Sequence, residues 1–162
     1  MSDWVHYEDY VVGERRLLGS RAVSEDDLLR FAREFDPQPF HVDPAAAAKS
    51  IYGGLIASGW HICAVAMRVI CDSFLAKAAS LGSPGIERIR FINPMRPGDV
   101  LTVWYTVLEA RPSASKPDRG VLLTEIEIEN QKGQKVATIR GYSLVGRRPQ
   151  KERAGASAPA AP

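Results

Sequence analysis

Hydrophobic residues recur at helical spacing in the first part of the chain. The first predicted helix has four apolar residues on one face: Leu28, Phe31, Ala32 and Phe35. Ser24 can cap its start, and Asp27 three residues later forms an acidic variant of the capping box. The helix should end near Asp36, because Pro37 disfavours the α conformation in the residue before it.

The next segment is dominated by prolines. Pro39 acts on Gln38 as Pro37 acts on Asp36, so we expect an extended, stiff segment over residues 36–41. A short helix should follow over residues 45–51, with Asp43 as its N-cap and proline in its first position. Two glycines then end that helix, at residues 53 and 54.

The longest apolar region runs from Trp60 to Leu81 and predicts a helix that begins after the cap Ser58. It is apolar on nearly every face, so it should lie at the centre of the fold with other elements around it. Charged residues interrupt it, which argues against a membrane span. Its two cysteines, Cys63 and Cys71, lie about 12 Å apart along such a helix. A disulfide is therefore excluded, no metal-ligand spacing is present, and both thiols should be reduced.

The rest of the chain has the composition and alternation of strands. Five strands are expected, over residues 11–21, 86–91, 100–108, 121–129 and 135–145. Residues 130–133 predict a hairpin turn. Trp104 and Tyr105 are adjacent in one strand, so one should face the core and the other could support a partner contact. The order predicts an α+β domain in which a long helix lies on a curved antiparallel sheet.

Composition and charge limit the classes of function. The chain has 162 residues and a formal net charge of +2, so no strong basic field favours nucleic acid as a partner. We expect one domain over residues 1–146 and a mobile tail over residues 147–162, which has no large apolar residue to bury. The first residues do not resemble a secretory signal, so a cytoplasmic location is expected.

Polar residues of restricted geometry concentrate between Asp36 and Gly59. A carboxylate and an imidazole, Asp36 and His41, lie in the proline-locked segment, where both could act on one water molecule. Downstream, Ser58 and Gly59 open the long helix. Its first N–H groups have no intrahelical partner, so they could bind a carbonyl oxygen that gains negative charge.

Several separated strings resemble one family. Residues 31–43 (FAREFDPQPFHVD) resemble the hydratase motif of the MaoC-like dehydratases, also called (R)-specific enoyl-CoA hydratases. Residues 45–49 and 57–59 resemble the short helix and the glycine-containing helix entry that follow it, and residues 90–99 resemble the later strand and turn. The resemblance covers roughly residues 5–146, in order.

The resemblance implies the hot-dog fold, in which a bent antiparallel sheet wraps a long helix. It also implies syn addition of water to a trans-2-enoyl thioester of coenzyme A, giving an (R)-3-hydroxyacyl thioester, or the reverse reaction. By position, Asp36 and His41 would activate the water, and the Gly59 N–H would bind the thioester oxygen. No metal or redox cofactor is expected, and coenzyme A enters only as part of the substrate.

Two positions depart from the family pattern. Gln38 replaces the asparagine of the motif, and Ser58 stands where many members have histidine. Both lie beside the predicted oxyanion and substrate-binding position, so they bear on the choice of substrate. Two alternatives stay open: a hot-dog acyl-CoA thioesterase, and a non-catalytic acyl-CoA-binding protein.

Coenzyme A carries phosphates, so basic residues should lie near the entrance to the site. Arg88, Arg90 and Arg96 are the candidates, although for each of them a solvated surface charge or a local ion pair is the favoured interpretation. Hot-dog proteins generally pair their sheets, with the active site at the interface. A homodimer, or a higher oligomer built from dimers, is therefore expected, because one small domain has little room for a closed tunnel.

Overall fold

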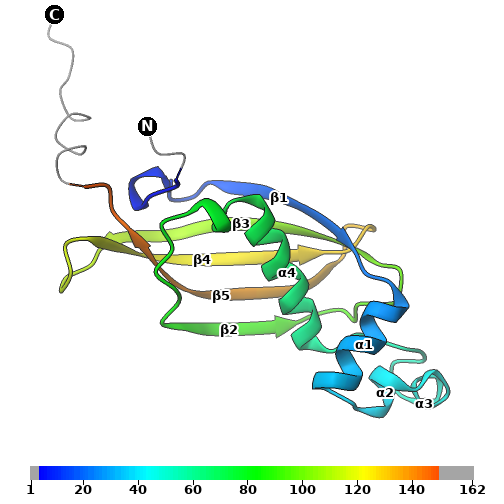
Figure 1. Ribbon diagram of the computed structural model, residues 1–162. Helices are drawn as coiled ribbons and strands as arrows, with labels where there is room; N and C mark the ends of the chain where they lie inside the picture. The colour runs from blue at the N-terminus through cyan, green and yellow to red at the C-terminus, as the bar shows by residue number, and fades with distance from the viewer. Residues whose placement is uncertain (1–3, 150–162) are drawn as a thin grey trace, which may run out of the picture.

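The computed structural model describes residues 4–149. Its centre is a five-stranded antiparallel sheet with the strand order β1-β3-β4-β5-β2 (Figure 1). The strands are β1 (Arg15–Ala22), β2 (Gly85–Phe91), β3 (Val100–Pro112), β4 (Arg119–Glu129) and β5 (Lys135–Gly146). The predicted turn at residues 130–133 joins β4 to β5, with the Gly133 N–H bonded to the Asn130 carbonyl at 2.9 Å. The α+β class is therefore confirmed.

The helices are η1 (Tyr7–Asp9), α1 (Glu25–Phe35), α2 (Pro39–Val42), α3 (Pro44–Lys49), α4 (Gly59–Ser73) and η2 (Leu75–Lys77). Helix α4 runs across one face of the sheet, α1, α2 and α3 lie together at one end of it, and η1 lies at the other end (Figure 1). The predicted caps are present: Ser24, Asp43 and Ser58 each accept a hydrogen bond from a backbone N–H in the first turn of α1, α3 and α4. These short-range signals place α1 and the start of α4 where the sequence predicted them.

The main core lies between α4 and the sheet. Ile62, Val65 and Val69 of α4 are buried in one apolar cluster with Val103 of β3 and Ile128 of β4. The other side of α4 is open in the single chain, where Trp60 and Met67 are 62% and 50% exposed. The prediction that this helix is covered all round is therefore correct for the sides that face the sheet and α1, but not for the side with Trp60 and Met67.

The long helix is shorter than predicted. It ends at Ser73, because Phe74 leaves the helical conformation and its ring packs against Tyr10 and Tyr105. The first strand begins at Arg15 and not at residue 11, since Gly13 takes a positive φ of 83° in a turn. No helix in residues 4–149 is both long and apolar enough to cross a membrane.

The segment over residues 36–41 is extended only as far as Gln38. From Pro39 to Val42 the chain forms the short helix α2, so the prediction of an extended conformation at His41 is wrong. Proline restricts the residue before it, but its own φ suits the first position of a helix, which is where Pro39 lies. His41 is thereby buried, at 5% exposure.

The last described residues remain attached to the domain. Arg147 and Arg148 form ion pairs with Glu8 and Asp9 of η1, at 3.2 and 2.6 Å. The charges of these two arginines therefore meet two carboxylates of the N-terminal segment, and the mobility expected from residue 147 onward stays a prediction. The rest of the predicted tail, residues 150–162, lies outside the described residues.

Candidate functional site

An open groove of about 470 Å³ lies beside the start of α4. Its walls come from the end of α1, from α2, from the loop before α4 and from the end of β2. Its polar lining residues are Asp36, Gln38, His41 and Asn93. Its large apolar lining residues are Phe40, Tyr52, Ile56, Trp60, Ile62, Phe91 and Ile92. A few convergent polar groups in an apolar groove are typical of a small-molecule site.

Asp36 lies at the C-cap of α1, and both oxygens of its carboxylate are held. Ser58 Oγ donates to Oδ2 at 2.7 Å, and Gln38 Nε2 donates to Oδ1 at 2.8 Å. Both hydrogen bonds lower the pKa of the Asp36 carboxyl below its ordinary value, and the bond from Ser58 has the larger effect. Partial burial opposes this effect, and the charge of His41 adds to it. Asp36 is therefore an ionised, oriented carboxylate at neutral pH.

His41 is oriented by the backbone across the groove. Its Nδ1 lies 2.8 Å from the carbonyl oxygen of Ile56. Because a carbonyl oxygen can only accept, Nδ1 carries the proton, and Nε2 has the lone pair when the ring is neutral. Nε2 lies 3.5 Å from Asp36 Oδ2. This is longer than a direct hydrogen bond, and both atoms belong to residues that line the groove.

The start of α4 supplies a backbone donor to the same groove. Among the described residues, none accepts a hydrogen bond from the Gly59 N–H, which is the first of the helix. Ser58 Oγ accepts from the Trp60 N–H at 3.2 Å. The Phe91 ring packs against Gly59 so closely that a Cβ on Gly59 would lie 2.5 Å from Phe91 Cζ. Only glycine leaves room for this ring at the helix entry.

The structure brings five predicted residues together: Asp36, Gln38, His41, Ser58 and Gly59. Ser58 and Gln38 were predicted beside the oxyanion position, and the structure places both against the Asp36 carboxylate. Sequence reasoning missed the Ser58–Asp36 bond, which joins residues 22 positions apart. It also missed the apolar lining, for which hydrophobicity alone gave no distinguishing signal.

The three candidate arginines do not line the groove. Arg96 is anchored by the backbone, since its guanidinium donates to the carbonyl oxygen of Tyr52 at 2.6 Å. Arg88 and Arg90 are exposed on β2, and Arg88 lies 3.6 Å from a carboxylate oxygen of Glu125. In the described part of the chain, no group of three or more His, Cys, Asp or Glu side chains could hold a metal ion.

Comparisons with known proteins agree on one family. The family model described as MaoC like domain matches residues 10–129. A solved MaoC-like dehydratase from Rhodospirillum rubrum is 42% identical, with a TM-score of 0.83 over 90% of this chain and 99% of that one. The R-hydratase PhaJ1 from Pseudomonas aeruginosa is 26% identical, with a TM-score of 0.70 over 89% of this chain and 87% of that one. YdeM of Bacillus subtilis, a protein described as uncharacterized, is 32% identical over 80% of this chain and 90% of its own length. These likenesses confirm the predicted hot-dog fold.

Proposed function

Because the chain belongs to the MaoC-like domain family, we propose that it hydrates a trans-2-enoyl thioester of coenzyme A to an (R)-3-hydroxyacyl thioester, or catalyses the reverse dehydration. The observation that carries this proposal is the pair of Asp36 Oδ2 and His41 Nε2, 3.5 Å apart at the groove. One water molecule can bridge two such atoms, and both are acceptors. They would orient the water with its oxygen toward the groove.

His41 is the proposed base. Its Nε2 removes a proton from the bridging water while the water oxygen bonds to C3 of the enoyl group. The ionised Asp36 holds the water and stabilises the imidazolium that forms. His41 then returns a proton to C2 from the same side, so that OH and H add to one face. These steps need only proton transfer and hydrogen bonding, so the proposal includes no metal or redox cofactor.

The Gly59 N–H is the proposed donor to the thioester oxygen. Attack at C3 moves electron density onto that oxygen, and a fixed donor stabilises it more in the transition state than in the substrate. In other enzymes, removal of one such donor costs about 3–4 kcal/mol of the barrier. The apolar groove wall, with Phe40, Trp60 and Phe91 among its members, suits the acyl part of the substrate.

The test is hydration of crotonyl-CoA and of longer enoyl-CoAs, measured as loss of the absorbance of the conjugated thioester. Asp36→Asn and His41→Ala should each lower kcat by roughly 10²–10⁴-fold. Asp26→Asn and His6→Ala are the matched controls. Neither residue lines the groove, so both substitutions should leave turnover unchanged. Wild-type turnover in either site variant would refute the assignment.

Two further measurements on the same substrates separate the alternatives. Release of free thiol, measured with a thiol reagent, would favour a thioesterase. Tight binding of enoyl-CoA without any turnover would favour a non-catalytic acyl-CoA-binding protein. We also propose that the working unit is a homodimer, because the groove is open beside an exposed Trp60 and an exposed Phe91.

A further inference from the structure

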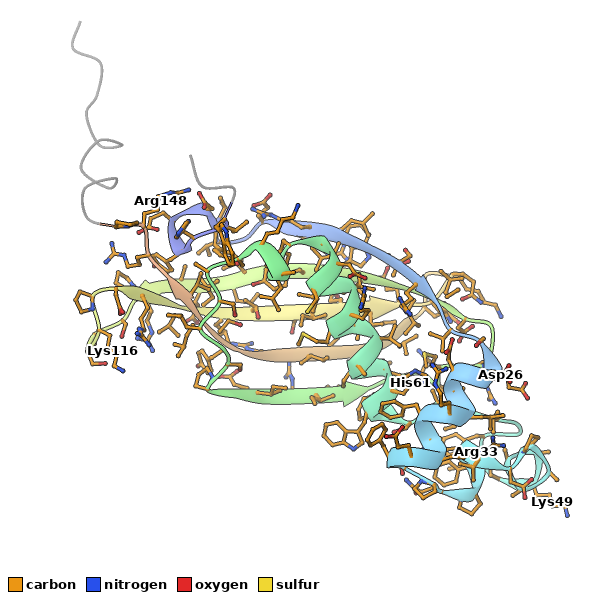
Figure 2. All side chains as sticks on the ribbon, viewed as in Figure 1. Asp26, Arg33, Lys49, His61, Lys116 and Arg148 are labelled. Carbon is orange, nitrogen blue, oxygen red and sulfur yellow. The ribbon has the colours of Figure 1, made fainter. Side chains whose placement is uncertain are left out.

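A second cavity, of about 230 Å³, lies between α1 and α4, and no residue lines both this cavity and the groove. Its walls are formed by the facing sides of α1 and α4 and by the end of β1. On α1 the lining residues include Asp27, Arg30 and Phe31, and on α4 they include His61 and Arg68. Figure 2 labels His61 at the point where α4 faces α1. The proposed reaction leaves this cavity unused.

His61 is buried in this cavity wall. The residue is 7% exposed, and its Nδ1 has no partner among the described residues. Its ring stacks on Phe31, with ring centres 4.6 Å apart and planes 7° apart. Burial lowers its pKa, so the ring is neutral at neutral pH. A buried polar atom without a partner costs free energy that an apolar residue would avoid, so a ligand that satisfies the imidazole would account for it.

The charges around the cavity favour one kind of ligand. Three arginines, Arg21, Arg30 and Arg68, line it with two carboxylates, Asp27 and Glu34, and Asp72 lies beside Arg68, so the local charges balance. Arg30 is paired with Asp27 at 2.6 Å, and Arg68 is paired with Asp72 at 2.8 Å. In the described part of the chain, no residue forms a hydrogen bond or ion pair with the guanidinium of Arg21, whose backbone pairs with β3. One cationic fork is therefore free to bind an anion.

We propose that this cavity binds a small organic monocarboxylate. The guanidinium of Arg21 would hold the carboxylate through two hydrogen bonds, a geometry for which its planar fork is suited. The apolar body would lie against Phe31 and Val65, and one oxygen of the same carboxylate would accept a hydrogen bond from the His61 ring N–H. The two nearby carboxylates disfavour a doubly charged phosphate. Pockets for drug-sized ligands measure roughly 300–1,000 Å³, so this cavity suits a smaller molecule than an acyl-CoA.

The experiment titrates the full chain with sodium acetate and sodium benzoate and follows the imidazole resonances by NMR. The chain has only three histidines, so the His61 signals are assigned by their loss in His61→Leu. Either carboxylate should shift the His61 signals in a saturable way. Arg21→Ala should weaken the binding about tenfold or more. Arg33→Ala is the matched control, because it removes an exposed arginine of α1 that does not line the cavity, and it should bind as wild type does.

His61→Leu gives a second, independent readout. It removes the polar atom that lacks a partner, so the unliganded variant should melt at or above the wild-type temperature, while the stabilisation by benzoate should be lost. Three results would overturn the proposal: His61 signals that neither carboxylate moves, equal affinity in Arg21→Ala, or tighter binding of inorganic phosphate. Binding is measured directly, so none of these results depends on enoyl-CoA turnover.

Discussion

At the scale of single residues, the site depends on how the Asp36 carboxylate is held. Ser58 hydroxyl and Gln38 amide bind one oxygen each, and both act on the charged form. The same Ser58 hydroxyl accepts from the Trp60 N–H, so it connects the carboxylate to the first turn of α4. The position of the proposed oxyanion donor and the orientation of the carboxylate are therefore coupled through one side chain.

Ser58→Ala and Gln38→Ala should both raise the pKa of Asp36 toward its ordinary value of 3.8. Because the folded-state pKa lies below the unfolded-state value, Asp36 stabilises the fold above the unfolded pKa, and this contribution is lost as pH falls through the folded pKa. Both variants should begin acid unfolding at a higher pH than wild type. Circular dichroism across an acid titration measures this.

The two variants differ in a useful way. Ser58→Ala also removes a helix cap, which costs about 0.5–2 kcal/mol, whereas Gln38→Ala does not. The loss of the cap lowers the free energy of unfolding equally at every pH. The loss of the hydrogen bond to Asp36 instead makes the free energy of unfolding depend less steeply on pH in acid. Ser20→Ala removes an exposed hydroxyl that bonds to Thr102, and should titrate as wild type. Acid slopes that match wild type in both site variants would contradict this view of Asp36.

The sequence predicted the proposed catalytic residues Asp36 and His41, which the structure places at one groove, but not all of their surroundings. Asp36, His41 and Gly59 follow from a local motif, and the structure brings them to one groove. The bond between Ser58 and Asp36 spans 22 positions and depends on how α1 and α4 dock, which no local pattern encodes. His61 interrupts an apolar run in the sequence, but only its packing against Phe31 shows that its ring is buried.

At the scale of elements, capping residues predicted the helix starts correctly and alternating polarity predicted the strands. The prolines were compatible with either an extended segment or a helix. Ser24, Asp43 and Ser58 bind backbone groups within three residues, so local sequence decides them. Pro39 could either keep the chain extended or begin a helix. The tertiary contact between His41 and the Ile56 carbonyl favours the helix, and that contact is not visible in the sequence.

Phe91 of β2 packs against Gly59 of α4, and a substitution at Gly59 tests this contact. Gly59→Ala would place a Cβ at 2.5–2.9 Å from three Phe91 ring carbons, so the ring must move. Such overpacking typically costs about 1–3 kcal/mol. We expect a loss of stability in denaturant unfolding, together with a loss of kcat/KM, since the ring and the Gly59 N–H border the same groove.

A double variant isolates that contact. In Gly59→Ala/Phe91→Leu the smaller side chain leaves more room, so the combined loss of stability should be smaller than the sum of the single losses. Gly85→Ala is the matched control, because a Cβ there would meet nothing within 4 Å. Additive losses in the double variant would show that the Phe91 ring does not limit this position.

At the scale of the whole molecule, the sheet leaves an open edge beside the groove. β2 is an end strand of the described sheet and pairs only with β5. It carries exposed Ile86 and Phe91, with exposed Ile92 directly after it. An unpaired edge with exposed apolar side chains is a site for association, which fits the proposed homodimer.

Ile86→Lys should therefore break the dimer. A lysine from each subunit would add like charges along a pairing edge, where proteins use lysine to prevent association. Wild type should scatter light as a species of about twice 17.8 kDa at micromolar concentration, and the variant as one of 17.8 kDa. Thr106→Lys changes an outer position of the interior strand β3 and should remain dimeric.

If the groove is completed by the partner, the monomeric variant should also lose turnover of long enoyl-CoAs more than of crotonyl-CoA. A wild-type protein that is monomeric throughout would remove the dimer from the proposal and leave the Asp36–His41 pair to act within one chain.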